Sequence, residues 1–357
     1  MDSPHSARFR LARPGRHPGG TRGPWGCRWP DVPDERAPLS DQAFQHLPVM
    51  VDEIGTLFGP VPRGFVLDAT IGGGGHAEHL LDRWQHLSIL GIDRDEQALV
   101  AAQRRLARFG QRVRVYHTRF DGLDDAMAAL KIDTLSGALF DLGVSSPQLD
   151  VAERGFSYRN DAPLDMRMDQ TQPWSAKDVV NGYPMDQLAL VLRQYGDERF
   201  ARRIATAIVA ARPIETTSQL AEVVVTAIPA AARRTGGHPA KRTFQAIRIE
   251  VNGELEALPT ALAAAIDRTE PGGRIAVLSY HSGEDRIVKE TFREAQTGGC
   301  SCPPELPCVC DAVQTVRLVR GVPRTPSSAE QAGNRRAASA RLRVVERVAD
   351  SPTVGRR

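Results

Sequence analysis

Val66-Leu67-Asp68-Ala69-Thr70-Ile71-Gly72-Gly73-Gly74-Gly75-His76 is the stretch of sequence that decides the fold. A short apolar run ends in Asp68, and four consecutive glycines precede a helical pattern that begins at His76. Glycine weakens helices and strands because it loses the most backbone entropy on ordering. Between a strand and a helix, however, a run of glycines suits a ligand that lies against bare backbone. The stretch therefore predicts a strand–loop–helix unit with a ligand at the loop, although a tight structural turn would also need glycine.

A second acidic residue at the end of a strand favours ligand binding over a structural turn. The apolar run 87–92 ends in Asp93, at the place where a βαβ unit commonly binds ribose. The loop does not match the dinucleotide fingerprint, because the sixth position of the fingerprint holds Ala77 or Glu78, depending on the glycine from which it is counted. Asp68 would also repel a pyrophosphate. The charges therefore favour S-adenosylmethionine, which carries a sulfonium, an ammonium and a ribose, over NAD.

Apolar runs alternate with helical patterns through the first part of the chain. Strands are expected at 65–68, 89–93, 113–117 and 137–142, with helices from 76, over 96–109 and over 123–130. Helical periodicity then dominates over 176–181, 185–195, 198–211, 218–228, 241–258 and 259–268. A fifth strand, a helix and a last strand-like run follow at 274–280, 284–294 and 340–348. This order predicts an α/β fold: a parallel, Rossmann-like sheet that an all-helical domain interrupts after the fourth strand.

Composition is that of an ordinary soluble protein. The chain has 357 residues, of which 41% are hydrophobic and 25% charged, and its net charge of +3 does not by itself demand a nucleic-acid partner. No apolar run is long enough for a membrane span, and residues 1–44 lack the apolar region of a signal peptide. We therefore expect a cytoplasmic protein without a membrane partner.

The same features suggest domain boundaries. Residues 1–44 are expected to be a disordered Arg/Gly/Pro-rich extension, and 346–357 a flexible tail. We assign the remaining chain to a sheet domain, an inserted helical domain for substrate recognition and a cysteine-rich loop, at 45–146 with 269–345, at 147–268 and at 298–312.

The cysteine-rich loop holds four of the five cysteines, at Cys300, Cys302, Cys308 and Cys310. So few cysteines in a chain of this length do not indicate a secreted disulfide scaffold. One residue between neighbouring cysteines is not the usual zinc-ribbon spacing, yet four thiolates could still surround one zinc ion. The alternative is a surface loop of reduced thiols. We assign no metal to the functional site.

Oxygen acceptors gather after the fourth strand. Asp141, Ser145 and Ser146 follow its apolar run. An exocyclic amine of a base attacks poorly because its lone pair is delocalised into the ring, and acceptors that pull on its hydrogens would make it a better nucleophile. Correct positioning would then supply most of the acceleration. Asp141 is therefore the best candidate for a catalytic residue, with a capping or solvated carboxylate as the alternative.

Other side chains leave two interpretations open. Phe156 and Tyr158 could stack on an extruded base or pack in the core. His281, at the end of the fifth strand, could contact substrate or be structural. Basic residues collect in the helical region and form either a solvated face or a footprint for a phosphate backbone: Arg199, Arg202, Arg203, Arg233, Arg234, Lys241, Arg242 and Arg248.

Several segments together resemble the family of small-subunit ribosomal RNA methyltransferase H, also called MraW. The resemblance spans roughly residues 45–345 in collinear order, through 68–76, 93–95, 141–150, 154–157, 163–169, 195–201, 238–246 and 279–289. It implies a class I methyltransferase sheet with an inserted helical domain, S-adenosylmethionine as cofactor, and N4-methylation of a cytidine in the decoding region of 16S rRNA. The substrate would be the 30S subunit or a late assembly intermediate, and the enzyme a monomer or a homodimer.

The resemblance also implies cofactor-binding residues: Gly74, Gly75 and His76 at the methionine part, Asp93 at the ribose, Phe120 against the adenine, and Asp141 and Gln148 completing the pocket. The residues alone indicate Asp93, Asp141 and the glycine loop, but not Phe120 or Gln148. The alternatives are a dehydrogenase, a methyltransferase acting on protein or small molecules, and a non-catalytic RNA-binding factor.

Overall fold

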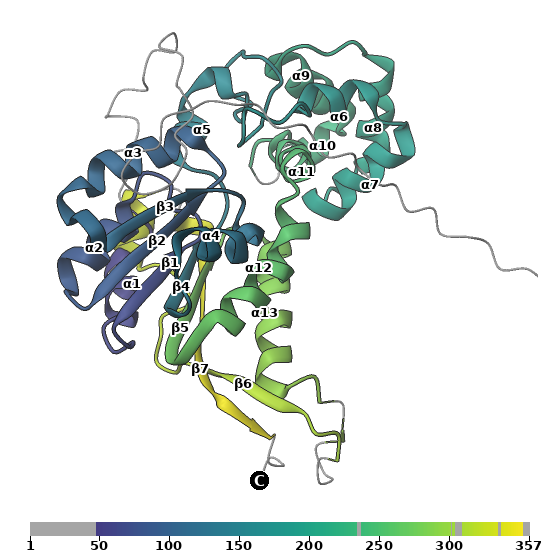
Figure 1. Ribbon diagram of the computed structural model, residues 1–357. Coiled ribbons are helices and arrows are strands. Elements are labelled where there is room, and N and C mark those ends of the chain that lie inside the picture. Colours follow the sequence, from purple (N-terminus) through teal and green to yellow (C-terminus); the bar gives the residue numbers. More distant parts are fainter. Residues whose placement is uncertain (1–47, 234–236, 301, 304–308, 335–336, 353–357) are drawn as a thin grey trace, which may run out of the picture. The chain divides into compact units, whose positions relative to one another are not determined.

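A seven-stranded sheet organises the structure, in the order β3-β2-β1-β4-β5-β7-β6 (Figure 1). The strands are β1 Gly64–Asp68, β2 Leu87–Asp93, β3 Val113–His117, β4 Leu135–Asp141, β5 Thr269–Ser279, β6 Val313–Leu318 and β7 Arg341–Pro352. Strands β1 to β5 pair in parallel, whereas β7 runs antiparallel to both β5 and β6. The strand order reverses between β1 and β4, which is where open α/β sheets bind their ligands.

The computed structural model describes residues 48–233, 237–300, 302–303, 309–334 and 337–352. The extension expected at 1–44 and residues 353–357 of the expected tail lie outside these residues, whereas residues 346–352, expected to begin the flexible tail, form the end of a strand. The helices that precede the long helical region are α1 Val51–Leu57, α2 Gly75–Arg83, α3 Glu96–Leu106, α4 Leu123–Leu130 and α5 Ser146–Asp150. The later helices are α6 Ala176–Gly182, α7 Met185–Gly196, α8 Ala201–Ala210, α9 Thr217–Ala227, α10 Ala230–Arg233, α11 Lys241–Asn252, α12 Glu254–Arg268, α13 Ser282–Thr297 and α14 Ser328–Gly333.

Helices cover both faces of the sheet because side chains alternate along each strand. Val66 of β1 belongs to a cluster that contains apolar residues of α1, α2 and α3. Its neighbour Leu67 points to the opposite cluster, with residues of α4, α12 and α13. Strands buried on both faces read as nearly continuous apolar runs, which is why they are conspicuous in the sequence.

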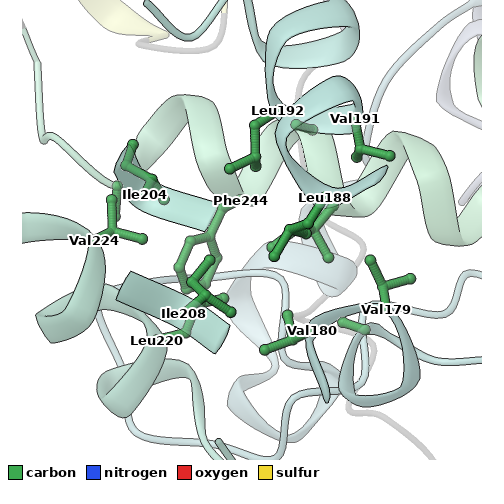
Figure 2. Close-up of a cluster of buried hydrophobic side chains, with 14 of the residues drawn as sticks. Val179, Val180, Leu188, Val191, Leu192, Ile204, Ile208, Leu220, Val224 and Phe244 are labelled. Atoms are coloured by element: carbon green, nitrogen blue, oxygen red, sulfur yellow. The ribbon is translucent and has the colours of Figure 1, made fainter. Parts of the chain in front are cut away.

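The helices between β4 and β5 have a hydrophobic cluster of their own (Figures 1 and 2). Figure 2 shows its central side chains, from α6 to α9 and α11: Val179, Val180, Leu188, Val191, Leu192, Ile204, Ile208, Leu220, Val224 and Phe244. These helices nevertheless belong to the same compact unit as the sheet.

One predicted helix boundary is wrong. The sequence suggested a break before Pro259, but the chain breaks at Gly253 and Pro259 lies inside α12. Gly253 has a left-handed backbone (φ 58°) and its N–H donates to the carbonyls of Ile249 and Glu250, as glycine does at helix ends. Pro259 costs α12 one hydrogen bond, which burial of the neighbouring Leu258 and other apolar residues offsets.

Five further helices and strands were missed by the sequence: α1, α5, α10, α14 and β6. The other predicted strands and helices overlap the observed ones. Two helices between β4 and β5 begin with a capping box, α6 with Ser175 and Asp178 and α9 with Thr216 and Gln219. Among the described residues, no helix is long and apolar enough to cross a membrane.

Candidate cofactor and substrate site

Three carboxylates meet at the carboxyl ends of the neighbouring strands β2, β1 and β4. They are Asp93, Asp68 and Asp141, each the last residue of its strand. Asp68 is only 2% exposed, and its burial raises its pKa to about 7, with the nearby Asp141 and Asp93 adding to the rise and His76 opposing it. Removal from water and the adjacent Asp95 raise the pKa of Asp93 to about 6. Carboxyl groups crowded in this way favour a bound cation.

The glycine loop is fastened to one of these carboxylates. The N–H of Gly72 donates to Asp93 Oδ2 (2.9 Å), and the N–H of Asp95 donates to Oδ1 (2.9 Å). Gly74 begins α2 with a left-handed backbone (φ 78°), and a Cβ there would lie 3.1 Å from Leu106 Cδ1. A Cβ on Gly75 would lie 2.6 Å from Pro48 Cγ. The loop therefore needs glycine both for its backbone conformation and for lack of room.

Asp141 is held by groups on three other elements. Its N–H donates to Thr70 Oγ1 (2.8 Å), and the hydroxyl of Tyr280 donates to its Oδ1 (2.6 Å). Its other oxygen, Oδ2, lies 3.5 Å from His76 Nε2. Burial, together with Asp141, raises the pKa of Tyr280 well above its ordinary value, so the hydroxyl stays a donor. The sequence pointed to Asp141 and His76, but it gave Tyr280 no role.

His76 carries unused hydrogen-bonding capacity. Its side chain is 6% exposed, and neither ring nitrogen makes a hydrogen bond to any residue that the structure describes. A buried polar atom without a partner is costly unless a ligand or water satisfies it. His76 thus marks a place for a polar ligand between the glycine loop and Asp141.

A buried ion pair stabilises the residues next to the site. Arg154 Nη2 lies 2.8 Å from Asp95 Oδ2, and these side chains are 3% and 7% exposed. Gln148 joins them: its amide donates to Asp95 Oδ2 (3.2 Å), while its Oε1 accepts from the N–H of Ser145 (3.0 Å). Gln148 is therefore buried among the residues that link the β4 end to the β2 end. The pair joins residues far apart in the chain, and no local pattern indicates it.

Phe120 lies just after β3, as the sequence predicts, in a short turn of 3₁₀ helix. Its half-buried ring meets Phe140 of β4 edge to face, with 6.2 Å between ring centroids. The ring also packs against the hydrophobic cluster that contains residues of α4, α12 and α13.

The structure bears on the alternatives left open for Phe156, Tyr158 and His281. Phe156 is 6% exposed and belongs to the helical cluster, which supports core packing. Tyr158 is half-buried and stacks on His238, with 4.4 Å between ring centroids. His281 caps α13 and accepts from the N–H of Glu284, which supports the structural alternative.

Of the eight basic residues that the sequence groups, seven are described, and six of these are exposed: Arg199, Arg202, Arg203, Arg233, Lys241 and Arg242. Arg248 is 14% exposed and makes a two-bond pair with Glu254. Arg233 donates to the carbonyls of Ile228 and Thr226, and Arg242 to that of Asp197, because ends of helices and turns leave carbonyls unsatisfied. Arg202 faces Asp186 at 3.6 Å. Arg234 lies outside the described residues.

The sequence profile of the MraW methylase family matches residues 43–348. The chain belongs to this family. A ribosomal RNA small subunit methyltransferase H from Mycobacterium sp. (strain KMS) is 51% identical over 326 residues, covering 88% of this chain and 87% of its own. A protein of the same name from Thermobifida fusca (strain YX) is 52% identical over 309 residues, covering 85% and 93%. A solved structure, of a putative rRNA methylase from Clostridium thermocellum, is 14% identical, with a TM-score of 0.38, and covers 84% of this chain and 95% of its own.

The residues of this MraW family member fit its methyl donor, S-adenosylmethionine. The donor is cationic and carries no phosphate, and the site offers it three carboxylates, a loop of bare glycine backbone, and a buried histidine whose ring nitrogens make no hydrogen bond to the described residues. The same carboxylates would repel the pyrophosphate of NAD. The prediction of the cofactor from the charge of the loop is confirmed.

Proposed function

We propose that the protein methylates the exocyclic N4 of a cytidine in the decoding region of 16S rRNA. The printed name of its relatives supports small-subunit ribosomal RNA as the substrate. The observation that carries the N4 chemistry is Asp141, an oxygen acceptor fixed by Tyr280 and Thr70 at the switch point, beside the glycine loop. A target in the folded decoding region favours the 30S subunit or a late assembly intermediate, in the cytoplasm, as the natural substrate.

For the donor we propose a specific set of contacts. Gly74, Gly75 and His76 would line its methionine part, Asp93 would hold its ribose, Phe120 would face its adenine, and Asp141 and Gln148 would complete the pocket. The unused nitrogens of His76 and the remaining lone pairs of Asp93 support this arrangement. Gln148 would act through Asp95 and Ser145, to which its amide is already bound.

When bound, the donor supplies an electrophilic methyl group whose bond to sulfur breaks as a nucleophile takes it. The chain has to make the N4 amine nucleophilic and hold it in line. Asp141 would accept a hydrogen bond from N4, so that the nitrogen lone pair is withdrawn from the ring and directed at the methyl carbon. Tyr280 holds that carboxylate, and Thr70 holds the Asp141 backbone, before substrate arrives; this preorganisation is the main contribution to rate.

We propose that residues 147–268 recognise the RNA together with α13. A groove of about 590 Å³ on α13 is lined by exposed cationic side chains, Arg286, Lys289, Arg293 and Arg341, with Asp285, Glu290 and Ser282 among them. Ser282 Oγ donates to Asp197 Oδ2 (2.7 Å), so the groove begins where α13 meets the helical region. Exposed cations along such a groove suit an RNA backbone.

The test uses 30S subunits that lack the modification, the purified protein and labelled S-adenosylmethionine. Mass spectrometry of the digested rRNA is expected to detect N4-methylcytidine in one decoding-region fragment. A methyl group on a different atom or in a different RNA would overturn the proposal. A Lys289→Glu, Arg293→Glu double variant should bind donor normally but show weaker, less salt-dependent binding to RNA.

A further inference from the structure

The cysteine-rich loop is closed at its base by backbone contacts. It connects the end of α13 to β6, the edge strand of the sheet. Gly298 and Gly299 leave α13 with left-handed backbones (φ 62° and 73°), and a Cβ on Gly298 would lie 2.5 Å from the backbone of Val313 at the start of β6. Thr315 Oγ1 donates to the Ala295 carbonyl (3.2 Å). The two ends of the loop are thus side by side before the thiols are considered.

Three thiols converge above this base. The sulfur atoms of Cys300, Cys302 and Cys310 all lie within 4.8 Å of one another. In a tetrahedral site with zinc–sulfur bonds of about 2.3 Å, neighbouring sulfurs are about 3.8 Å apart. A shift of roughly one ångström would therefore bring the three thiols to the spacing of metal ligands. They come from both ends of the loop, so the metal would join those ends.

The chemistry of the ligands selects the metal. Thiolates are soft ligands that favour zinc over magnesium or calcium, and three of them supply three positions of a tetrahedral zinc site. Cys300 and Cys302 are half-buried, which is typical of structural rather than exposed reactive thiols. Cys308 lies outside the described residues. We propose that Cys300, Cys302 and Cys310 bind a zinc ion that fastens the edge strand β6 to the C-terminal end of α13.

The position of the site makes its role structural. The 16 residues of α13 span about 24 Å, and the methyl-donor site is near the opposite, N-terminal end, at Tyr280. Strand β6 pairs only with β7 among the described strands, and a long loop before an edge strand is costly to close. Metal binding would offset that cost, since it couples to folding when its ligands are brought together only in the folded chain.

The experiment measures zinc in the full-length protein, purified with reductant and dialysed against a weak chelator. We expect one tightly bound zinc ion per chain, and its loss in a Cys302→Ser variant. The matched control is Cys27→Ser, which changes the one cysteine outside the cysteine-rich loop and should keep the metal. Zinc added to metal-free protein should also release protons from the thiols, and cobalt in its place should give thiolate-to-metal charge-transfer absorption.

A second measurement on the unchanged protein covers the case in which the serine variant fails to fold. A thiol reagent should modify the cluster cysteines only after zinc is removed. Wild-type protein that holds no zinc after reconstitution, or whose cluster thiols form a disulfide under reducing conditions, would overturn the proposal. So would a Cys302→Ser variant that folds and keeps stoichiometric zinc. None of these outcomes depends on methyl transfer.

Discussion

Replacing Tyr280 by phenylalanine tests whether Asp141 must be held in place. The substitution removes only the hydroxyl that donates to Asp141 Oδ1 over 2.6 Å. Hydrogen bonds to charged acceptors contribute about 1.5–3 kcal/mol. Each 1.4 kcal/mol corresponds to about a factor of ten in rate, so kcat/KM should fall about 10- to 100-fold if the positioning of Asp141 is expressed in the transition state.

The chain contains a matched control. Tyr183 makes the same kind of bond, from its hydroxyl to Glu250 Oε1, also over 2.6 Å, but in the helical region. Tyr183→Phe should lower the free energy of unfolding by an amount similar to Tyr280→Phe, because each variant leaves a carboxylate without one donor. It should not change methyl transfer.

The assay measures kcat and KM for methyl transfer to 30S subunits that lack the modification, beside thermal unfolding of each variant. We expect the activity loss to be confined to Tyr280→Phe and the stability loss to be shared. If both variants kept wild-type kcat/KM while Tyr280→Phe was destabilised, Tyr280 would be structural and the positioning role refuted.

Three other substitutions probe the loop, the carboxylates and the ion pair. Gly74→Ala places a methyl group 3.1 Å from Leu106 at a residue with φ 78°, so it should lower the free energy of unfolding by about 1 kcal/mol or more and weaken donor binding. Gly182→Ala is the control, because nothing lies within 4 Å of its Cβ, and it should change neither quantity. Calorimetry measures both. Burial raises the pKa of Asp68 from 3.8 to about 7, so the donor-free protein should lose stability to urea as pH rises through that range, and the loss should be smaller in Asp68→Asn, where only the raised pKa of Asp93 still contributes. Arg154→Met leaves the Asp95 carboxylate buried and unpaired, so the free energy of unfolding measured in urea should fall by about 3–5 kcal/mol. Adding Asp95→Asn should restore part of that stability. Equal stabilities of the single and double variants would contradict this.

Much of the site could be predicted because its carboxylates are the last residues of strands that the sequence reveals. Asp68, Asp93 and Asp141 each end an apolar run, and parallel strands bring such ends to one edge of the sheet. Tyr280 directly follows β5, next to β4, and the same rule extended to the fifth strand would have found it.

What could not be predicted depends on contacts between distant segments. Asp95 and Arg154 are 59 residues apart, and only the packed structure shows that they pair. Strand β6 mixes apolar and polar residues and lies at an edge, so it lacks the continuous apolar run of the buried strands. Arg248 looked available for RNA because the sequence does not show that Glu254, across the turn at Gly253, binds it.

The central claim is that carboxylates at neighbouring strand ends bind a cationic methyl donor. Isothermal titration calorimetry of the purified protein with S-adenosylmethionine, with NAD as comparison and Asp93→Ala as variant, tests it most directly. We predict one donor molecule bound per chain, no binding of NAD, and a loss of affinity of at least about tenfold in Asp93→Ala, as expected for hydrogen bonds to a charged acceptor. Tight binding of NAD, or donor binding that is unchanged in Asp93→Ala, would contradict it.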